Sequence, residues 1–235
     1  MKQSNNKTMK QSNNPTMKYL PLIFFYFLLT GCFEVREEVN MKADGSGEVS
    51  FVLNLSESRE SVAKYMAMGS AEGFKLPKKE EVEANLDKIK TLMAAVPGMS
   101  AVMTKSDWSS YIFSVSGRFA HVEALNKAVE IVAKEYDKQG KYTVAGQTGF
   151  VYSNGQFKRF STYPPKAKEF AELPSIQRYV LESAKMTSIY RFDRSIRRVS
   201  HPKAQLSPSG KAVMLQLPLS DLLKGTATLT ETVTF

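Results

Sequence analysis

Cysteine is nearly absent from this sequence: Cys32 is the only one among 235 residues. A single thiol cannot form a disulfide within the chain, nor the set of several thiols that holds a structural zinc ion. If Cys32 itself is modified, no cysteine nucleophile remains either. The protein therefore depends on a packed core for its stability, and a chain of this length is long enough to build one.

Motifs of known catalytic sites are lacking as well. The two histidines, His121 and His201, are far apart in the sequence, and the chain contains no His-Glu-x-x-His and no Gly-x-Ser-x-Gly motif. Ser209-Gly210-Lys211 has neither the first glycine of a phosphate-binding loop nor the hydroxyl residue that follows its lysine. We therefore expect no catalytic, metal-binding or cofactor-binding residues, and a protein that is not an enzyme.

Long runs of basic residues are also missing, although the formal net charge is +9. Since no stretch of lysine and arginine exceeds two residues, the sequence does not indicate nucleic-acid binding. The densest basic patch could contact anionic lipid, and it is equally compatible with a charged strand edge that resists aggregation. Its members are Arg191, Arg194, Arg197 and Arg198.

The first sixteen residues form a polar tandem repeat, MKQSNNKT followed by MKQSNNPT. A segment whose only apolar residue type is methionine cannot contribute to a core. Either the repeat is a duplicated upstream segment and synthesis starts at Met17, or it is a long polar beginning of the segment that follows. In both cases we expect it to be removed with that segment.

A short apolar run follows the repeat. Lys18 precedes residues 20–28, which carry no charge, and the run ends at Leu29-Thr30-Gly31-Cys32. A basic start, an apolar stretch and small residues at the end are the features of a secretory signal peptide. The run is shorter than the roughly 20 apolar residues that a membrane span requires. We therefore expect residues 1–31 to be removed as a signal peptide, and residues 32–235 to form a single domain.

The end of this run resembles the lipobox of bacterial lipoproteins. The resemblance implies that the Cys32 thiol is alkylated with diacylglycerol, that a signal peptidase cuts after Gly31, and that the freed amino group is acylated. The membrane, reached through this N-terminal lipid, is then an expected partner. The apolar Leu29 would anchor the motif in the membrane, and the small Thr30 and Gly31 would let the peptidase approach the backbone.

The residue after the expected lipidated cysteine bears on the location. In many Gram-negative bacteria an aspartate at this position retains a lipoprotein in the inner membrane, and here the position holds Phe33. We therefore expect an outer-membrane location. No run of acids immediately follows Cys32, so we expect the domain to face the periplasm. The inner membrane and the cell surface stay open as alternatives.

Alternating apolar residues and turn motifs predict β-hairpins in the rest of the chain. Segments 33–42 and 48–55 flank Asp44-Gly45-Ser46-Gly47 and predict a hairpin; half a calcium loop formed by Asp44, Ser46 and Glu48 is the weaker interpretation. We expect Trp108, near a second turn, to fold back onto the sheet, with contact to a ligand or membrane as the alternative. Further strands are expected at 101–105, 110–119, 142–145, 149–152, 156–160, 188–192, 196–200, 212–217 and 226–235.

Apolar residues spaced by three and four positions predict amphipathic helices between these strands. The clearest apolar stripes lie at 79–96 and 122–136, and we expect both to face the core. Other helices are expected at 56–69, 166–171, 175–186 and 219–224. The sequence thus predicts an α+β fold, in which an antiparallel sheet is built from hairpins and amphipathic helices pack on it.

This order of elements resembles the organisation of LppM-type lipoproteins: a strand with an Asp-Gly turn follows the cysteine, helices come next, and late strands include 188–200 and 212–217. The resemblance implies an α+β fold that holds a hydrophobic ligand, but no binding residue carries over. We expect a lipid-anchored envelope protein with a non-enzymatic binding or assembly role. A carrier of a lipid-like ligand, which a closed apolar cavity would favour, is the alternative, and an envelope enzyme ranks third.

Replacing Cys32 tests the anchor directly. A Cys32→Ser variant lacks the only thiol of the chain, so we expect no incorporation of labelled palmitate and accumulation of the uncut precursor. Metabolic labelling followed by gel electrophoresis measures both effects. Palmitate label that persists in the variant would contradict the lipobox interpretation.

Overall fold

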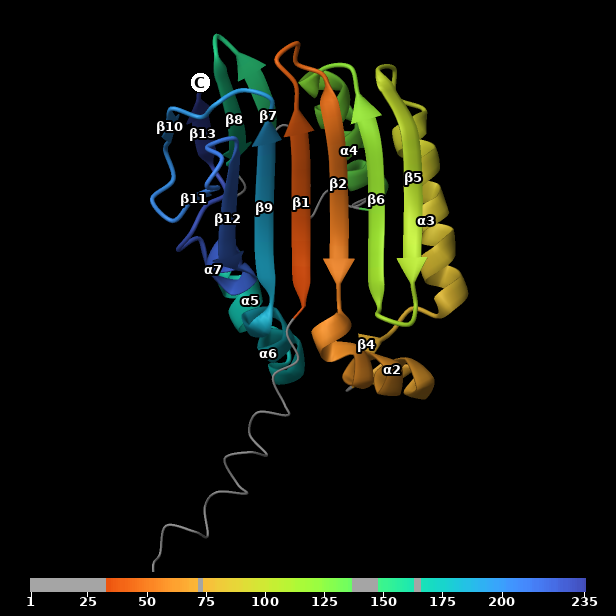
Figure 1. The fold of residues 1–235 in the computed structure, drawn as a ribbon. Coiled ribbons are helices and arrows are strands. Elements are labelled where there is room, and N and C mark those ends of the chain that lie inside the picture. Colours follow the sequence, from red (N-terminus) through yellow and green to blue (C-terminus); the bar gives the residue numbers. More distant parts are fainter. Residues whose placement is uncertain (1–32, 72–73, 137–147, 163–165) are drawn as a thin grey trace, which may run out of the picture. The chain divides into compact units, whose positions relative to one another are not determined.

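The protein has a two-layer α+β fold, seen in a computed structural model that describes residues 33–71, 74–136, 148–162 and 166–235. The chain divides into two units, Met1–Thr30 and Gly31–Phe235, and all described residues belong to the second. A seven-stranded sheet forms one layer of this unit (Figure 1). A four-stranded sheet lies beside helices α3 (Lys79–Ala94) and α4 (Val122–Tyr136) in the other layer. The predicted α+β class is confirmed.

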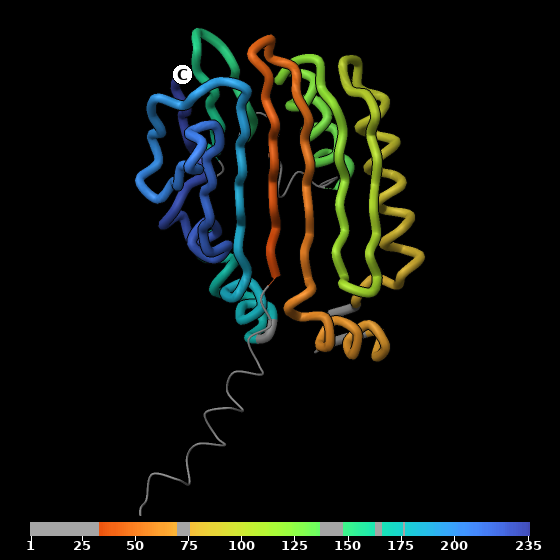
Figure 2. The backbone as a smooth tube through the Cα atoms, viewed as in Figure 1, coloured from red at the N-terminus to blue at the C-terminus, as the bar shows by residue number. Residues whose placement is uncertain are grey.

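Hairpins predicted from the sequence make up most of the large sheet. Its strands are β1 (Glu34–Met41), β2 (Gly47–Asn54), β5 (Met99–Asp107), β6 (Ile112–Phe119), β9 (Lys185–Phe192), β11 (Gln205–Leu206) and β12 (Ala212–Pro218). Their order across the sheet is β11-β12-β9-β1-β2-β6-β5, and Figure 2 shows the long strands side by side. The pairing departs from antiparallel in one place, since β1 and β9 run parallel at the centre of the sheet.

The second layer contains the strands that end the chain. Its sheet has the order β10-β13-β8-β7, with β7 (Thr148–Ser153), β8 (Gln156–Ser161), β10 (Arg198–Val199) and β13 (Glu231–Thr234). The strands expected at 196–200 and 226–235 are thus shorter than predicted, and the strand expected at 142–145 lies outside the described residues. Helix α4 covers the free edge of β7, because the Asn126 amide both donates to the Phe150 carbonyl and accepts from its N–H, each at 2.8 Å.

Short helices gather at the end of the large sheet where β1 begins (Figure 1). They are η3 (Ser56–Ser58), α2 (Arg59–Met68), α5 (Ala167–Ala171), α6 (Ser175–Ser183) and α7 (Leu219–Lys224), and a two-stranded sheet of β3 (Ser70–Ala71) and β4 (Phe74–Lys75) follows α2. Helix α6 ends before the predicted boundary at Met186, because Lys185 already pairs with Glu34 in the sheet. None of the helices described in the structure has the length and apolar character needed to cross a membrane.

The core forms between the two layers because alternate residues of each strand point to the same face. Val39, Val49 and Tyr190 occupy neighbouring register positions on β1, β2 and β9, and all three are buried. Phe157 of the small sheet packs on Tyr190 with ring centroids 4.9 Å apart, and Leu125 of α4 is buried in the same cluster. Both predicted apolar stripes therefore contribute to the core, through Met93 on α3 and Leu125 on α4.

A buried ion pair connects the two sheets. Glu37 has the same parity on β1 as Val39, so its carboxylate points into the core, where only 3 % of the residue is exposed. The Arg159 guanidinium of β8 donates to both carboxylate oxygens at 3.0 and 3.1 Å, and the Tyr190 hydroxyl donates to one of them at 2.8 Å. Burial is the largest single influence on Arg159 and disfavours its charge, but attraction to and hydrogen bonding with Glu37 and Tyr190 together outweigh it and raise the arginine pKa.

A second carboxylate is buried next to this pair without such compensation. Glu231 on β13 is the register partner of Arg159 and has an exposed fraction of 0 %. Within the described part of the chain, neither of its carboxylate oxygens has a hydrogen-bond partner. Burial raises the pKa of Glu231 from 4.5 to about 7, because the neutral acid costs less to bury than the anion.

Breaking the buried pair from one side should destabilise the fold strongly. Arg159→Met leaves the Glu37 carboxylate in the core without its cation and with only the Tyr190 hydroxyl as partner, and we expect a loss of about 3–5 kcal/mol in the free energy of unfolding. The double variant Glu37→Gln with Arg159→Met removes both charges of the pair and should lose less. Urea unfolding measures both, and a double variant as unstable as Arg159→Met would contradict this account of the pair.

The pKa of Glu231 predicts how stability changes with pH. The folded state holds the proton more tightly than the unfolded state, so this contribution is full below pH 4.5 and is lost as the pH rises to about 7. The loss amounts to about 3 kcal/mol, at about 1.4 kcal/mol per pKa unit. Glu231→Gln should remove this decline and be more stable than the parent at pH 8. Urea unfolding at pH 5 and pH 8 tests it, and equal pH slopes for both proteins would refute it.

Candidate functional site

The residues predicted from the lipobox, Leu29, Thr30, Gly31 and Cys32, lie outside the described residues. Their roles in cleavage and lipidation stay predictions. The structure does fix the residue that follows them, because the Phe33 carbonyl accepts a hydrogen bond from the Lys185 N–H at 2.9 Å. The chain therefore enters the large sheet immediately after the predicted lipidation site.

The acidic turn after β1 closes a hairpin, as predicted. One carboxylate oxygen of Asp44 accepts hydrogen bonds from the Ser46 hydroxyl at 2.7 Å and from the Ser46 N–H at 2.9 Å. These bonds, with the hydroxyl contributing most, lower the pKa of Asp44. The side chain is thus occupied in holding the turn, and the described residues contain no group of three or more acidic, histidine or cysteine side chains suited to a metal ion.

Trp108 folds back onto the protein, which confirms the prediction for this residue. Its ring meets Phe113 of β6 edge-on, with centroids 4.8 Å apart, and its indole N–H donates to the Glu83 carboxylate of α3 at 2.6 Å. This bond and a second from Ser106 lower the pKa of Glu83. Trp108 therefore attaches the β5–β6 turn to α3, and it is half-buried.

The four arginines of the basic patch do not form one surface. Arg191 on β9 pairs with Glu38 at 2.6 Å on the large sheet, whereas the Arg194 guanidinium lies 5.2 Å from the Phe235 ring centroid. Arg198 belongs to β10, an edge strand of the small sheet, so the interpretation as a charged strand edge fits that residue. The histidines are likewise on separate elements, with His121 directly before α4 and His201 after β10.

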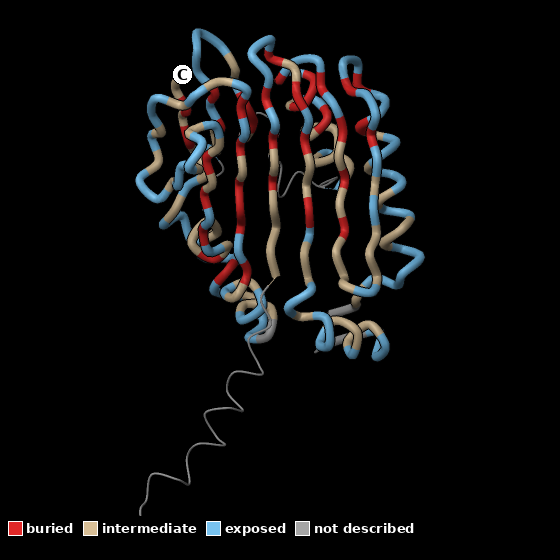
Figure 3. Tube along the Cα trace, in the orientation of Figure 1, coloured by how far each residue is buried: buried red, intermediate tan, exposed pale blue. Residues whose placement is uncertain are grey.

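One face of the large sheet is open. The core covers the other face, but no described helix or strand crosses this one (Figure 1), and Figure 3 shows half-buried and exposed residues along its strands. Charged side chains of both signs pair across it. Arg36 and Arg191 flank Glu38 at 2.9 and 2.6 Å, and Arg118 pairs with Glu48 at 3.1 Å.

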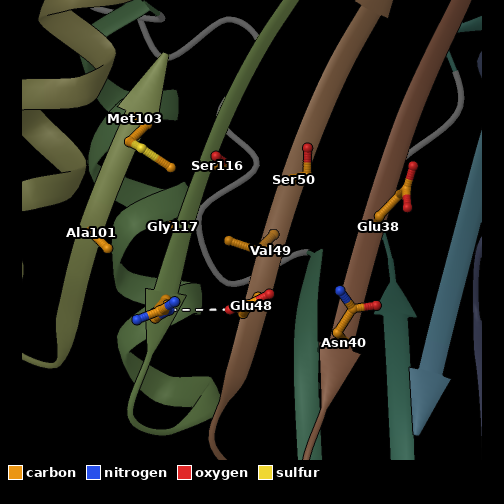
Figure 4. Close-up of a pocket in the computed structure, with 10 residues that line it drawn as sticks. Glu38, Asn40, Glu48, Val49, Ser50, Ala101, Met103, Ser116 and Gly117 are labelled. Carbon is orange, nitrogen blue, oxygen red and sulfur yellow. Dashed lines mark hydrogen bonds and ion pairs between the residues drawn. The ribbon is translucent and has the colours of Figure 1, made fainter. Parts of the chain in front are cut away.

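A hollow of about 180 Å³ lies on this open face (Figure 4). Small side chains create it: Ser50 and Ser116 are register partners on β2 and β6, and a bulge in β5 places Ala101 at its edge. Met103 and Glu38 border the hollow on opposite sides (Figure 4). It is smaller than the about 300 Å³ at which small-molecule sites begin. It can accept one side chain or ring of a larger partner, and its polar border does not match the closed apolar cavity expected of a carrier.

The open face as a whole approaches the size of a protein-binding surface. Six long strands run from β12 to β5. At spacings of about 4.8 Å between strands and about 3.3 Å per residue, they span a face of roughly 600 Å². A standard interface buries about 800 Å² on each partner. Exposed side chains add area beyond the flat outline, so this face approaches that size.

Sequence reasoning missed both the open face and the buried carboxylates. A signal for Glu37 was present, because Val35, Glu37, Val39 and Met41 share one parity on the predicted strand. The open face could not be recognised in the same way, since alternation shows that one side of a strand is polar but not which strands lie next to each other.

Comparisons with known proteins give little beyond this geometry. No family model matches the chain, and no curated protein matches it. Among solved structures, it is similar to the folded domain of the Mycobacterium tuberculosis LppM protein, determined by NMR, with 10 % sequence identity and a TM-score of 0.42. The likeness covers 86 % of this chain and 87 % of that domain. At this level of similarity, neither a binding residue nor an activity transfers to the present chain.

Proposed function

We propose that this protein is a lipid-anchored, non-enzymatic protein of the bacterial envelope that binds a protein partner through the open face of its large sheet. The observation that carries the proposal is that face, formed by six long strands and crossed by no described helix or strand (Figure 1). Antiparallel sheets often leave one face to solvent, so this face is available for binding, and its area approaches that of a standard protein interface.

The chemistry of the open face favours a polar partner of mixed charge. Arg118 and Glu48 already pair with each other, and so do Arg191 and Glu38, so the face presents no strong field of one sign. Such a surface suits another folded protein better than a polyanion, because a polyanion would require clustered unpaired cations. Met103, which is 61 % exposed, offers an apolar contact beside the hollow.

The anchoring part of the proposal rests on the sequence. Lipidation of Cys32 would hold the protein at the envelope, and Phe33 at the following position favours the outer membrane, with the domain in the periplasm. Two or more acyl chains would make this attachment stable. The binding face would then act on a partner of the same compartment.

Site-specific photocrosslinking in living cells tests the binding face. A photoreactive phenylalanine analogue replaces Met103 or Ser50 on the open face, or Lys90 on the exposed side of α3 as a control. We expect one protein adduct of the same mass from Met103 and Ser50, and none from Lys90, because only the open face would touch the partner. Mass spectrometry of the adduct identifies that partner.

A charge reversal separates specific binding from random capture. Arg118→Glu breaks the pair with Glu48 at the edge of the hollow and should lower the adduct yield from Met103 by about threefold or more. Lys90→Glu, with the same change in charge on α3, should leave the yield unchanged. Equal yields from the open face and from Lys90, or insensitivity to Arg118→Glu, would count against the proposed face.

A further inference from the structure

The predicted lipidation site has almost no linker to the folded domain. Cys32 is followed by Phe33, and β1 begins at Glu34. Consecutive Cα atoms are about 3.8 Å apart, so the two-residue step from position 32 to the first residue of β1 can span at most about 8 Å of chain. With lipid on Cys32, as the proposed function requires, the end of the large sheet where β1 begins is held against the bilayer.

Two helices belong to that same end of the sheet. Glu34 pairs with Asn54, the last residue of β2, and with Lys185, the first residue of β9. Helix α2 follows β2 after one turn of η3, and α6 ends just before β9. Both helices therefore lie next to the start of β1, as Figure 1 also shows. This end of the domain, formed by α2, α6 and the start of β1, is here called the anchor end.

The anchor end is unusually apolar for an exposed surface. Among the described residues, three of the eight exposed large apolar side chains lie on α2 and α6, and a fourth lies near the end of β2 beside them. Met68 on α2 is 63 % exposed and Val180 on α6 is 41 % exposed, while Tyr179 and Leu53 are the other two. Helix α2 has no fully buried residue: Val62, Tyr65 and Met66 are half-buried, and Met68 near its end is exposed. Such residues are typical of helices that lie in a membrane interface, where tyrosine is also favoured.

Polar groups at the anchor end suit lipid headgroups. A hollow of about 140 Å³ opens there, and it offers headgroups two carboxylates as well as a cation; its lining is Phe33, Glu34, Asn54, Glu57, Lys185 and Gln216. Lys185 and, on α2, Arg59 and Lys64 are exposed cations. Exposed cations beside exposed apolar side chains match the boundary between phosphates and acyl chains.

We infer that the anchor end lies flat on the phospholipid leaflet that holds the lipid anchor, with Met68 and Val180 inserted into the headgroup region. Strand β1 then leads away from the membrane, and its eight residues span about 26 Å at about 3.3 Å per residue. The large sheet is then upright on the membrane, and its open face is not covered by the bilayer. A partner of the proposed function can therefore reach that face without displacing lipid.

Fluorescent labels in vesicles test this orientation. Because Cys32 is the only cysteine and would be blocked by lipid, Met68→Cys and Val180→Cys each provide a unique thiol for an environment-sensitive dye. Ser153→Cys is the matched control, since its neighbour Tyr152 donates to the Ala43 carbonyl of the β1–β2 turn, at the opposite end of β1. The purified lipidated protein is placed in phosphatidylethanolamine–phosphatidylglycerol vesicles that carry a spin-labelled lipid quencher.

We expect the dyes at Met68 and Val180 to be quenched by about half, as for side chains buried about 5–10 Å into the interface, and the dye at Ser153 to be unaffected.

Vesicle flotation and the intact mass report the anchor separately. If the protein carries lipid and floats but all three dyes behave alike, the orientation is wrong and the anchor stands. If the intact mass shows no lipid on the protein, both the proposed anchor and the inferred orientation are overturned. Shielding of Met68 that rises with protein concentration without vesicles would show that a second copy covers this end, which also overturns the inference.

Discussion

The fold depends on strand β1, which joins two halves of the protein that are distant in sequence. On one side it pairs with β2, its hairpin partner, and on the other with β9, about 150 residues later. The same strand carries Glu37, whose carboxylate binds Arg159 of the small sheet and so connects the two layers. Strand β1 thus has two roles: its backbone hydrogen bonds join β2 to β9 in the large sheet, and the buried ion pair of Glu37 attaches the small sheet to the large one.

This arrangement explains why the two faces of the large sheet differ so strongly. Toward the core, Val39, Val49 and Tyr190 meet Phe157 and Leu125, and the carboxylate of Glu37 is tolerated only because Arg159 and Tyr190 satisfy it. Toward the solvent, neighbouring strands present Glu38, Arg36 and Arg191 as ion pairs. Exposed ion pairs contribute little to stability, so the open face is free to serve recognition.

Two proposed properties follow from how β1 is placed in the sheet. The predicted lipid would attach two residues before this strand, so the anchor end would stay at the membrane without a flexible linker. The strand direction would then hold the open face upright beside the bilayer. Two shallow polar hollows occur in the described part of the protein, and their size suits contacts within a larger interface better than a deep ligand site.

The sequence by itself determined the local elements. Turn chemistry at Asp44-Gly45 and the apolar stripe of 122–136 predicted a hairpin and a helix that the structure contains, because both depend on contacts between residues close in the chain. The lipobox, from Leu29 to Cys32, is also a local motif and stays a prediction from sequence. Only the tertiary structure decided that β1 pairs in parallel with β9 and that Val199 and Val233 belong to a second sheet. It also decided that the carboxylates of Glu37 and Glu231 are buried. These features depend on which distant segments pack together, and alternation within one strand carries no information about its neighbours.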